Sequence, residues 1–200
     1  MITTVIFDIG NVLVSFDWQT HLDSFGFSSE KQEIIADAVF RNNDWNEMDR
    51  GVLTIEECIA RFISHAPQYA EDIRNIVLGV RETIQPLPYT EELLRTLRAN
   101  GLNLYYLSNY GKFGYEETKD KLAFTKMMDG GLYSYEAQMI KPNLWIYAEL
   151  CERYHIHPME AVFLDDNLAN VNAACAFGMK GIHFTSYEDA CEELRALGVL

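Results

Sequence analysis

The sequence has few basic residues. Its 200 residues include 16 lysines and arginines against 30 aspartates and glutamates, which gives a formal net charge of −14 at pH 7. Nucleic acids and anionic membrane surfaces both attract clustered lysine and arginine, so neither is an expected partner. An anionic substrate such as a phosphate would need a local cation to overcome this field, and a metal ion would supply one.

Cysteine is scarce and shows no metal-binding pattern. The chain has no CxxC pair, and its four cysteines lie in apolar, helix-like segments: Cys58, Cys151, Cys175 and Cys191. We therefore expect free thiols in the core of a protein from a reducing compartment. The apolar start of the chain has no basic segment before it, unlike a signal peptide, and no uncharged apolar run is long enough to span a bilayer. These features favour a cytoplasmic protein.

The chain also lacks internal repeats and low-complexity segments, and its length suits one domain with a modest insertion. Short apolar and β-branched runs predict four buried strands: Thr3–Ile9, Leu102–Leu107, Ala161–Leu164 and Gly181–Phe184. A weaker fifth strand is predicted at 131–134. Helical patterns lie between them, for example one with Thr90 as its expected N-cap and Gly101 just past its end. This alternation predicts an α/β fold with a Rossmann-like parallel sheet covered on both faces.

One long segment after the first strand carries only helical patterns. Two spacings typical of a capping box, Ser or Thr followed three positions later by Gln or Glu, begin at Ser29 and Thr54. We therefore expect an all-helical cap, residues 16–85, inserted after the first strand. The α/β core would then be discontinuous, formed by residues 1–15 and 86–200.

Polar side chains follow the predicted strands at their carboxyl ends, where ligands of open parallel sheets collect. These are Asp8, Ser108, Asn109, Asp165 and Asp166. Taken singly, each suits a turn or a helix cap, and a lone Lys141 before the next helix suits a solvated surface. The adjacent acids are harder to dismiss, because they repel one another unless a cation or donors offset them. Together, these groups are suited to surround a phosphate and a divalent ion such as Mg²⁺.

The ordered motifs "FDIGNVLV", "LSN", "KPNLWIY" and "FLDDN" resemble the haloacid dehalogenase-like (HAD) hydrolase superfamily, whose members are mostly Mg²⁺-dependent phosphatases. The helical insertion resembles the cap of its subfamily I. "RGVLTIEE" and "VFLDDNLANVNAACAFGM" are most similar to the branch with sugar-phosphate phosphatases and the phosphatase domain of epoxide hydrolases. The likeness covers nearly the whole chain. It implies a Mg²⁺-dependent phosphatase of a small phosphorylated metabolite, such as a sugar phosphate, working as a monomer or weak homodimer.

The resemblance implies a role for each residue of the polar cluster. Asp8 would attack phosphorus and form an aspartyl-phosphate, and Lys141 would offset the charge of Asp8 and the phosphate as they approach. The phosphoryl group would be bound by Lys141 and three other residues: Asn11, Ser108 and Asn109. The metal would be held by three carboxylates and a backbone carbonyl: Asp8, Asp165, Asp166 and Gly10.

Gly10 departs from the superfamily's pattern, because most of its phosphatases carry a second aspartate there as the general acid for the leaving group. General acid–base help is typically worth about 10²–10⁴-fold. Three interpretations stay open: water or another side chain (Asp17 is the nearest acid in sequence) supplies the proton, the substrates have good leaving groups, or the protein binds phosphate and turns over poorly. Gly10 is also expected to meet a backbone need, either a positive φ or a close approach to the ion.

Two other reactions fit the same family less well. In hydrolytic dehalogenation the same aspartate attacks carbon, but dehalogenases of the superfamily need no metal, so the acidic pair Asp165 and Asp166 speaks against it. A phosphomutase would need the acid/base group that Gly10 lacks. A non-catalytic phosphate- or metabolite-binding protein is the remaining alternative, and it leaves the convergence of the polar groups unexplained.

The helical cap is expected to close over the site as a lid. Its polar stretch "RNNDWNEMDRG" would then face the substrate, with Trp45 stacking on a flat group and Arg41 or Arg50 meeting an anion. An equally good interpretation is a solvated loop between helices, with Trp45 packed into the core of the cap.

Overall fold

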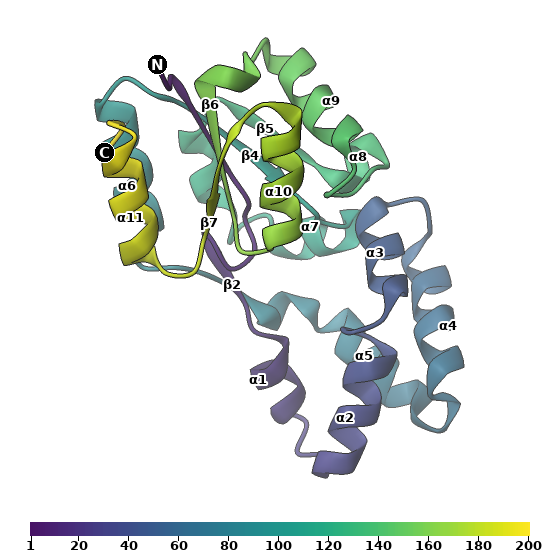
Figure 1. Cartoon of the computed structure of the whole chain (residues 1–200). Helices are drawn as coiled ribbons and strands as arrows, with labels where there is room; N and C mark the ends of the chain where they lie inside the picture. Colours follow the sequence, from purple (N-terminus) through teal and green to yellow (C-terminus); the bar gives the residue numbers. More distant parts are fainter.

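A five-stranded parallel sheet lies at the centre of the upper part of the chain in Figure 1. The computed structural model describes residues 1–200, and the strands run in the order β5–β4–β1–β6–β7. They are β1 (Thr4–Phe7), β4 (Asn103–Ser108), β5 (Gly130–Tyr133), β6 (Ala161–Asp165) and β7 (Lys180–His183). The predicted α/β fold class and all five predicted strands are confirmed, within one or two residues at each end.

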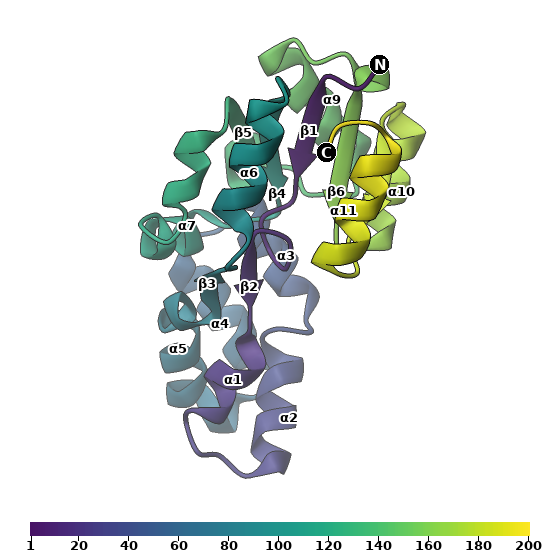
Figure 2. The same cartoon turned by 90° about the vertical axis from the view of Figure 1, so that its left-hand side faces the viewer.

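Helices cover both faces of the sheet, as Figure 2 shows. One face carries α6 (Thr90–Ala99) and α11 (Tyr187–Ala196), and the other carries α9 (Leu144–Tyr154) and α10 (Leu168–Phe177). Successive residues of the central strand β1 point to opposite faces, so both faces can be buried at once. All four residues of this strand are accordingly buried.

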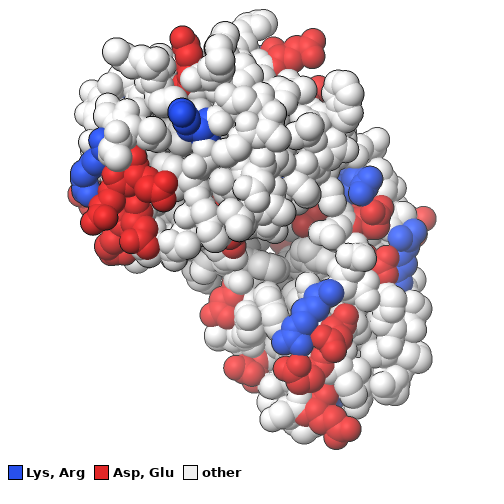
Figure 3. Space-filling model, viewed as in Figure 1, with Lys and Arg blue, Asp and Glu red and all other residues white.

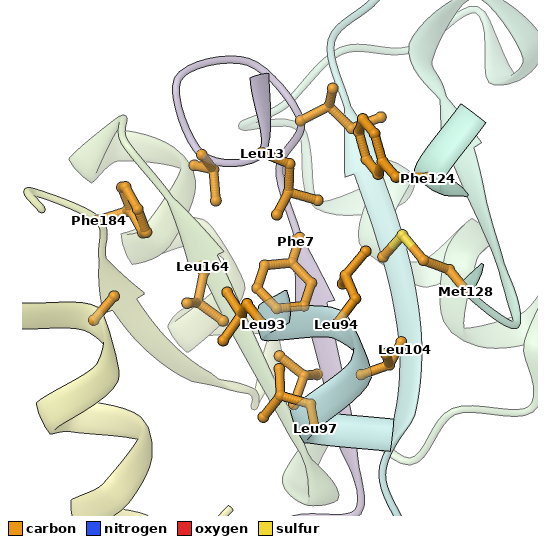
Figure 4. Packing of buried hydrophobic residues seen from close by; sticks show 14 of the residues in the cluster. Phe7, Leu13, Leu93, Leu94, Leu97, Leu104, Phe124, Met128, Leu164 and Phe184 are labelled. Atoms are coloured by element: carbon orange, nitrogen blue, oxygen red, sulfur yellow. The ribbon is translucent and has the colours of Figure 1, made fainter. Parts of the chain in front are cut away.

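The two sides of β1 enter separate hydrophobic clusters. Phe7 packs in a cluster with Leu94 and Leu97 of α6, shown in Figure 4, whereas its neighbour Ile6 packs with Tyr147 of α9. All these side chains are fully buried. Two short helices follow the strands on one side of β1: α7 (Lys112–Thr118) comes after β4, and α8 (Ser134–Ala137) comes after β5. The chain also has four 3₁₀ turns: Pro67–Tyr69, Val80–Thr83, Ala123–Met127 and Pro158–Glu160.

Five helices, called here the helical insert (residues 18–78), lie below the sheet in Figure 1. They are α1 (Trp18–Asp23), α2 (Ser29–Ala38), α3 (Asn43–Arg50), α4 (Ile55–His65) and α5 (Ala70–Leu78). They enclose a cluster of 13 buried apolar residues, including Ile59 and Phe62, that is separate from both clusters of the sheet. The helices therefore follow the predicted pattern, while the expected domain bounds at 16 and 85 stay a prediction.

A two-stranded antiparallel ribbon joins the helical insert to the sheet, and no strand was expected there. β2 (Val14–Phe16) leads into the insert and β3 (Ile84–Pro86) leads out of it, with Phe16 opposite Ile84. Strands of three residues are too short for a clear alternation of apolar and polar residues. The ribbon brings the two connections together, so the insert is attached to the core by paired strands rather than by two independent linkers.

Two of the predicted helix ends need correction. Ser28, not Ser29, is the N-cap of α2, accepting from the Lys31 N–H at 3.4 Å. Thr90 is not an N-cap either: it is the first residue of α6, and its buried hydroxyl donates to the Leu13 carbonyl at 2.6 Å. A hydroxyl can satisfy a carbonyl of a neighbouring segment instead of its own helix, a choice that local sequence does not reveal.

The structure confirms the second capping box and the glycine after α6. Thr54 accepts from the Glu57 N–H, and the Glu57 carboxylate accepts from the Thr54 N–H at 2.8 Å, so each residue caps the other. Gly101 has a φ of +82°, the left-handed conformation expected just past a helix end.

Three of the four cysteines are buried as expected, but Cys175 on α10 is exposed. All four are free thiols. No helix combines the length and the apolar character that crossing a membrane would require. Figure 3 shows that acidic side chains outnumber basic ones on the face drawn there, in line with the charge of the sequence.

We predict that Thr54→Ala lowers the free energy of unfolding by about 1 kcal/mol, because it removes the side-chain cap of α4. Chemical denaturation measured by circular dichroism would give this value. Ser29→Ala is the matched control, since Ser29 makes no side-chain hydrogen bond, and its effect should be close to zero. Equal losses in the two variants would contradict the assignment of the caps.

Candidate active site

The predicted cluster of polar residues forms at the carboxyl edge of the sheet. β1 lies between β4 and β6, so Asp8, Ser108 and Asp165 stand at or just beyond the ends of three adjacent strands. One oxygen from each of Asp8, Asp165 and Asp166 lies within 4.8 Å of the others. The strand order thus converts positions far apart in sequence into one acidic site.

Lys141 lies buried between two of these carboxylates. Its Nζ is 2.9 Å from Asp8 Oδ1 and 2.6 Å from Asp165 Oδ2, and the residue is 2% exposed. Burial lowers the pKa of Lys141, but the charges of Asp8 and Asp165 more than offset that effect, so its pKa is raised and it stays charged. The structure therefore places Lys141 in the site and not on the surface.

Hydrogen bonds hold Asp165 from several sides. Its Oδ2 accepts from Lys141, and its Oδ1 accepts from the Asn167 backbone N–H at 2.8 Å and from Asn170 Nδ2 at 3.0 Å. The residue is fully buried. Asp165 is thus fixed in orientation, and in turn fixes the Lys141 ammonium beside Asp8.

Asp8 keeps one carboxylate oxygen free of hydrogen bonds. Oδ1 accepts from the Ile9 N–H at 2.7 Å and pairs with Lys141, whereas Oδ2 accepts no hydrogen bond. Burial raises the pKa of Asp8 to about 7, opposed by Lys141 and reinforced by Asp165 and Asp166. A carboxylate in this setting gains from any further cation nearby.

Asn11 connects the turn after β1 to Asp166. Its Nδ2 donates to Asp166 Oδ2 at 2.9 Å, and its Oδ1 accepts from the Phe16 N–H at 3.0 Å. The residue adopts a left-handed φ of +55°, which asparagine tolerates better than most residues. Asn11 lines the same pocket as Asp8, and its side chain orients the acid expected to bind metal.

Asn109 holds the backbone of Lys141. Its Oδ1 accepts from the Lys141 N–H at 2.8 Å, and its Nδ2 donates to the Lys141 carbonyl at 3.1 Å. The neighbouring Ser108 is almost fully buried at the end of β4, and both residues line the pocket over Asp8. Ser108 and Asn109, two of the four residues expected to bind phosphate, are therefore at the site, and Asn109 also positions the lysine.

Gly10 does not adopt the positive φ that was one of two expectations for it, while a close approach to the ion stays a prediction. Its φ is not positive, since the left-handed residue of this turn is Asn11. A β-carbon built at Gly10 would meet no atom within 4 Å, so nothing in the protein enforces a glycine. Gly10 still lines the pocket, where a larger side chain would have room.

The residues present suit a divalent metal ion. Three carboxylates and one ammonium leave a net formal charge of −2 around the edge of the sheet, and their oxygens are the hard ligands that Mg²⁺ prefers. The pKa of Asp8 is raised mainly by burial and further by the charges of Asp165 and Asp166, so a bound cation would favour its ionised form.

The pocket over Asp8 lies between the sheet edge and the helical insert. Its polar floor contains Asp8, Ser108 and Asp166, whereas its walls are mostly apolar. The apolar lining comes from both parts of the chain: Phe16, Trp45, Met48, Val80, Ile84, Tyr110 and Phe113. In the view of Figure 3 the surface is hollowed between the upper and lower parts of the molecule.

The polar stretch "RNNDWNEMDRG" forms helix α3 and the residues around it, not a loop. Trp45 was expected either to face the substrate or to pack inside the cap. It does both, since it lines the pocket and also packs against Phe40 and Phe16. Arg41 pairs with Glu33 and Asp37 in an exposed position, and neither Arg41 nor Arg50 lines the pocket. Neither arginine is therefore placed to meet a substrate anion in this pocket.

Asp49, at the end of α3, is an acidic pocket residue to which the sequence analysis gave no role. It lines the pocket together with Asp8 and Ser108, although it belongs to the helical insert. Burial raises its pKa to about 7, opposed by the Gly111 N–H and reinforced by the charge of Asp8. Asp17, the acid nearest to Gly10 in sequence, instead caps α1 by accepting from the Thr20 N–H at 2.9 Å and lines no part of the pocket.

These observations define an α/β protein with an acidic, lysine-bridged site at the carboxyl edge of its sheet. The sequence model of the haloacid dehalogenase-like hydrolases matches residues 2–178. The chain therefore belongs to this family of hydrolases, as its ordered motifs predicted. The branch within the family stays a prediction.

The chain is similar to proteins whose names indicate different reactions. A sesquiterpene phosphatase of Aspergillus oryzae is 28% identical over 192 residues, which cover 96% of this chain and 94% of the relative. A HAD family enzyme of Bacteroides thetaiotaomicron, solved with magnesium and inorganic phosphate, has a TM-score of 0.71 at 19% identity over 95% of this chain and 99% of its own. L-2-haloacid dehalogenase of Xanthobacter autotrophicus, with chloropropionic acid covalently bound, has a TM-score of 0.67 at 18% identity over 100% of this chain and 85% of its own. The two solved structures show a shared fold.

We predict that Lys141→Met lowers the free energy of unfolding at pH 7 by about 3–5 kcal/mol, because it leaves two buried carboxylates without their cation. The loss should be smaller at pH 4, where protons neutralise the carboxylate whose pKa is raised. Denaturant unfolding of wild type and variant at both pH values, without added metal, would measure the difference. A loss below about 1 kcal/mol at pH 7 would contradict the buried ion-pair account.

Proposed function

We propose that the protein is a metal-dependent phosphatase in which Asp8 is the nucleophile. The observation that carries this proposal is the free Oδ2 of Asp8, at the floor of a pocket and beside a buried ammonium group. Attack by this oxygen on phosphorus would form an aspartyl-phosphate and release an alcohol. Water would then cleave the Asp8–phosphoryl bond, which regenerates the carboxylate and releases inorganic phosphate.

The neighbouring residues would divide the remaining tasks. Lys141 would neutralise charge as the phosphoryl group approaches Asp8, and its position is enforced by Asp165 and Asn109. Ser108 would donate its hydroxyl to a phosphoryl oxygen from the end of β4. Because these groups are held by other side chains before substrate arrives, little reorganisation would accompany the reaction.

A divalent metal, taken here to be Mg²⁺, would be held by Asp8, Asp166 and the backbone carbonyl of Gly10. When bound, the ion would neutralise phosphoryl oxygens and screen them from the carboxylates. We assign Asp165 mainly to Lys141, because both of its oxygens already accept hydrogen bonds. Its charge would still contribute to the attraction of the ion.

The substrate is proposed to carry an apolar organic group next to its phosphate. The walls of the pocket offer aromatic and aliphatic side chains, among them Trp45 and Phe113, and few polar partners for sugar hydroxyls. The printed name of the Aspergillus oryzae relative, a sesquiterpene phosphatase, supports the same class. A sugar phosphate, the substrate suggested by sequence, is less well matched to these walls.

Residues 16–85 are proposed to form the cap over a core of residues 1–15 and 86–200. The cap supplies several of the apolar wall residues, so its closure would exclude water from the reaction. The fold alone does not separate a phosphatase from a dehalogenase, since solved dehalogenases share it. The acidic cluster supports the phosphatase, because additional carboxylates would repel a haloacid unless a cation is bound.

Release of inorganic phosphate from a panel of sugar, nucleotide, aryl and isoprenyl phosphates tests this proposal. We expect release that requires Mg²⁺ and that falls by at least about 10³-fold in Asp8→Asn, since the nucleophile is removed. Circular dichroism would verify that the variant is folded. If folded wild-type protein released phosphate from none of these substrates with Mg²⁺, the phosphatase proposal would fail.

The substrate class leads to a separate prediction for Trp45. Trp45→Ala should raise KM for an isoprenyl phosphate by roughly 10-fold or more, because the loss of an aromatic contact costs about 1–3 kcal/mol of binding. For a short polar phosphate such as glycerol phosphate, KM should change less than about threefold. Steady-state kinetics on both substrates gives the comparison, and equal changes would argue against an apolar binding wall.

A further inference from the structure

The helical insert places one carboxyl group in the catalytic pocket. Asp49 lies in the last turn of α3 and lines the pocket with Asp8, Ser108 and Asp166 from the opposite side. It is partly buried and takes part in no ion pair, in contrast to Asp44 of the same helix, which pairs with Arg61 and His65.

Helix stability does not explain an acid at this position. The carboxyl end of a helix carries partial negative charge, which disfavours a carboxylate in the last turn. Asp49 is also close enough to Asp8 for the charge of that carboxylate to raise its pKa, to about 7, although burial makes the larger contribution. A group placed at a cost to stability, with a pKa near neutrality, is a candidate for proton transfer.

The backbone around Asp49 is fixed against the sheet-bearing part of the chain. The Ser134 hydroxyl donates to the Asp49 carbonyl at 2.5 Å. A β-carbon at Gly111 would come within 2.8 Å of the Met48 carbonyl oxygen, and one at Gly51 within 2.6 Å of Tyr135 Cβ. Two glycines and a hydrogen bond thus allow the end of α3 to pack closely against the part of the chain that carries the sheet. The position of Asp49 is therefore fixed by contacts at its own carbonyl and at the nearby Met48 and Gly51.

The sheet side of the pocket has no carboxyl group left to act as general acid. Gly10 occupies the position where most phosphatases of the family carry their general acid, and a β-carbon there would meet no atom within 4 Å. Asp17 caps α1 away from the pocket. Of the carboxyl groups that line the pocket, Asp8 and Asp166 are assigned to attack and to metal binding, which leaves Asp49.

We propose that Asp49 is the general acid and base of the reaction, supplied by the helical insert in place of the aspartate missing at Gly10. This inference rests on the proposed phosphatase activity. As Asp8 Oδ2 bonds to phosphorus, the bond from phosphorus to the leaving oxygen breaks, and that oxygen takes the proton of Asp49. The resulting Asp49 carboxylate then takes a proton from the water that attacks the aspartyl-phosphate, which restores both groups.

The test compares leaving groups in wild type and Asp49→Asn. Two aromatic substrates are used with Mg²⁺: 4-nitrophenyl phosphate, whose leaving group needs no proton, and 2-phenylethyl phosphate, whose alkoxide does. We expect kcat/KM for the alkyl ester to fall by about 10²–10⁴-fold in the variant, and that for the aryl ester by less than about 10-fold. Asp17→Asn is the matched control and should change neither value. Adding Gly10→Asp to the Asp49→Asn variant should restore at least part of the alkyl activity, because the structure has room for that side chain.

A second measurement needs no catalysis. In metal-free buffer, the wild type should lose stability relative to Asp49→Asn as the pH rises from 5 to 8, because its folded state must give up a proton that the unfolded carboxyl, with an ordinary pKa of 3.8, has already lost. The charged groups that face Asp49 are Asp8 and Lys141, and both are retained in the variant. The Tm of Asp49→Asn minus the Tm of wild type should therefore increase as the pH rises from 5 to 8.

Two results would overturn the assignment of Asp49 while leaving the phosphatase proposal intact. One is an unchanged kcat/KM for the alkyl ester in Asp49→Asn. The other is an equal loss on both esters, which would indicate a binding or structural role. If wild-type protein released phosphate from neither ester, the proposed function would fail and the role of Asp49 with it.

Discussion

The site depends on one buried ammonium group held between two carboxylates. Lys141 contacts Asp8 and Asp165 at 2.9 Å and 2.6 Å, and nearly all of its surface is shielded from water. Burying such charges costs several kcal/mol unless each is paired and hydrogen-bonded, so the surrounding residues have little freedom. Asn109 and Asn170 meet this demand: one fixes the lysine backbone and the other fixes Asp165. The same constraint leaves one oxygen of Asp8 free toward the pocket.

The helical insert completes the site from the other side. The sheet edge supplies charged and hydroxyl groups, whereas the insert supplies apolar wall residues and Asp49. The β2–β3 ribbon and the close contacts of Gly51 and Gly111 set the distance between these two surfaces. In this account, chemistry at phosphorus belongs to the sheet, and both the choice of substrate and the proton for its leaving group come from the insert.

The strand ends could be read from the sequence because their arrangement follows from topology. Parallel strands end at one edge, so the sequence predicts that Asp8, Ser108 and Asp165 meet there. The structure also confirmed the helical character of the inserted segment, while the β2–β3 ribbon was missed because its strands have three residues each. The prediction of Thr90 as an N-cap was wrong because its hydroxyl donates to the Leu13 carbonyl, far away in sequence, instead of capping its own helix.

Asp49 could not be found from the sequence, because its role depends on how α3 packs against the sheet. In the stretch "NEMDRG" it is one of several polar residues on a short helix, and nothing local distinguishes it from Asp44 or Glu47. The same stretch contains Arg41 and Arg50, whose charge suits an anion, but neither lines the pocket. The close approaches of Gly51 to Tyr135 and of Gly111 to Met48, with the hydrogen bond from Ser134 to the Asp49 carbonyl, place the end of α3 at the pocket that contains Asp8.

The central claim is that Asp8 becomes phosphorylated during the reaction. The most direct measurement is a single turnover of a competent phosphate ester with excess enzyme and Mg²⁺, quenched in acid and followed by mass mapping of the peptides. The account predicts a phosphoryl group on the peptide that contains Asp8, present before inorganic phosphate is released and lost on longer incubation. Turnover of the ester with no transient label on Asp8, or with the label on another residue, would contradict it.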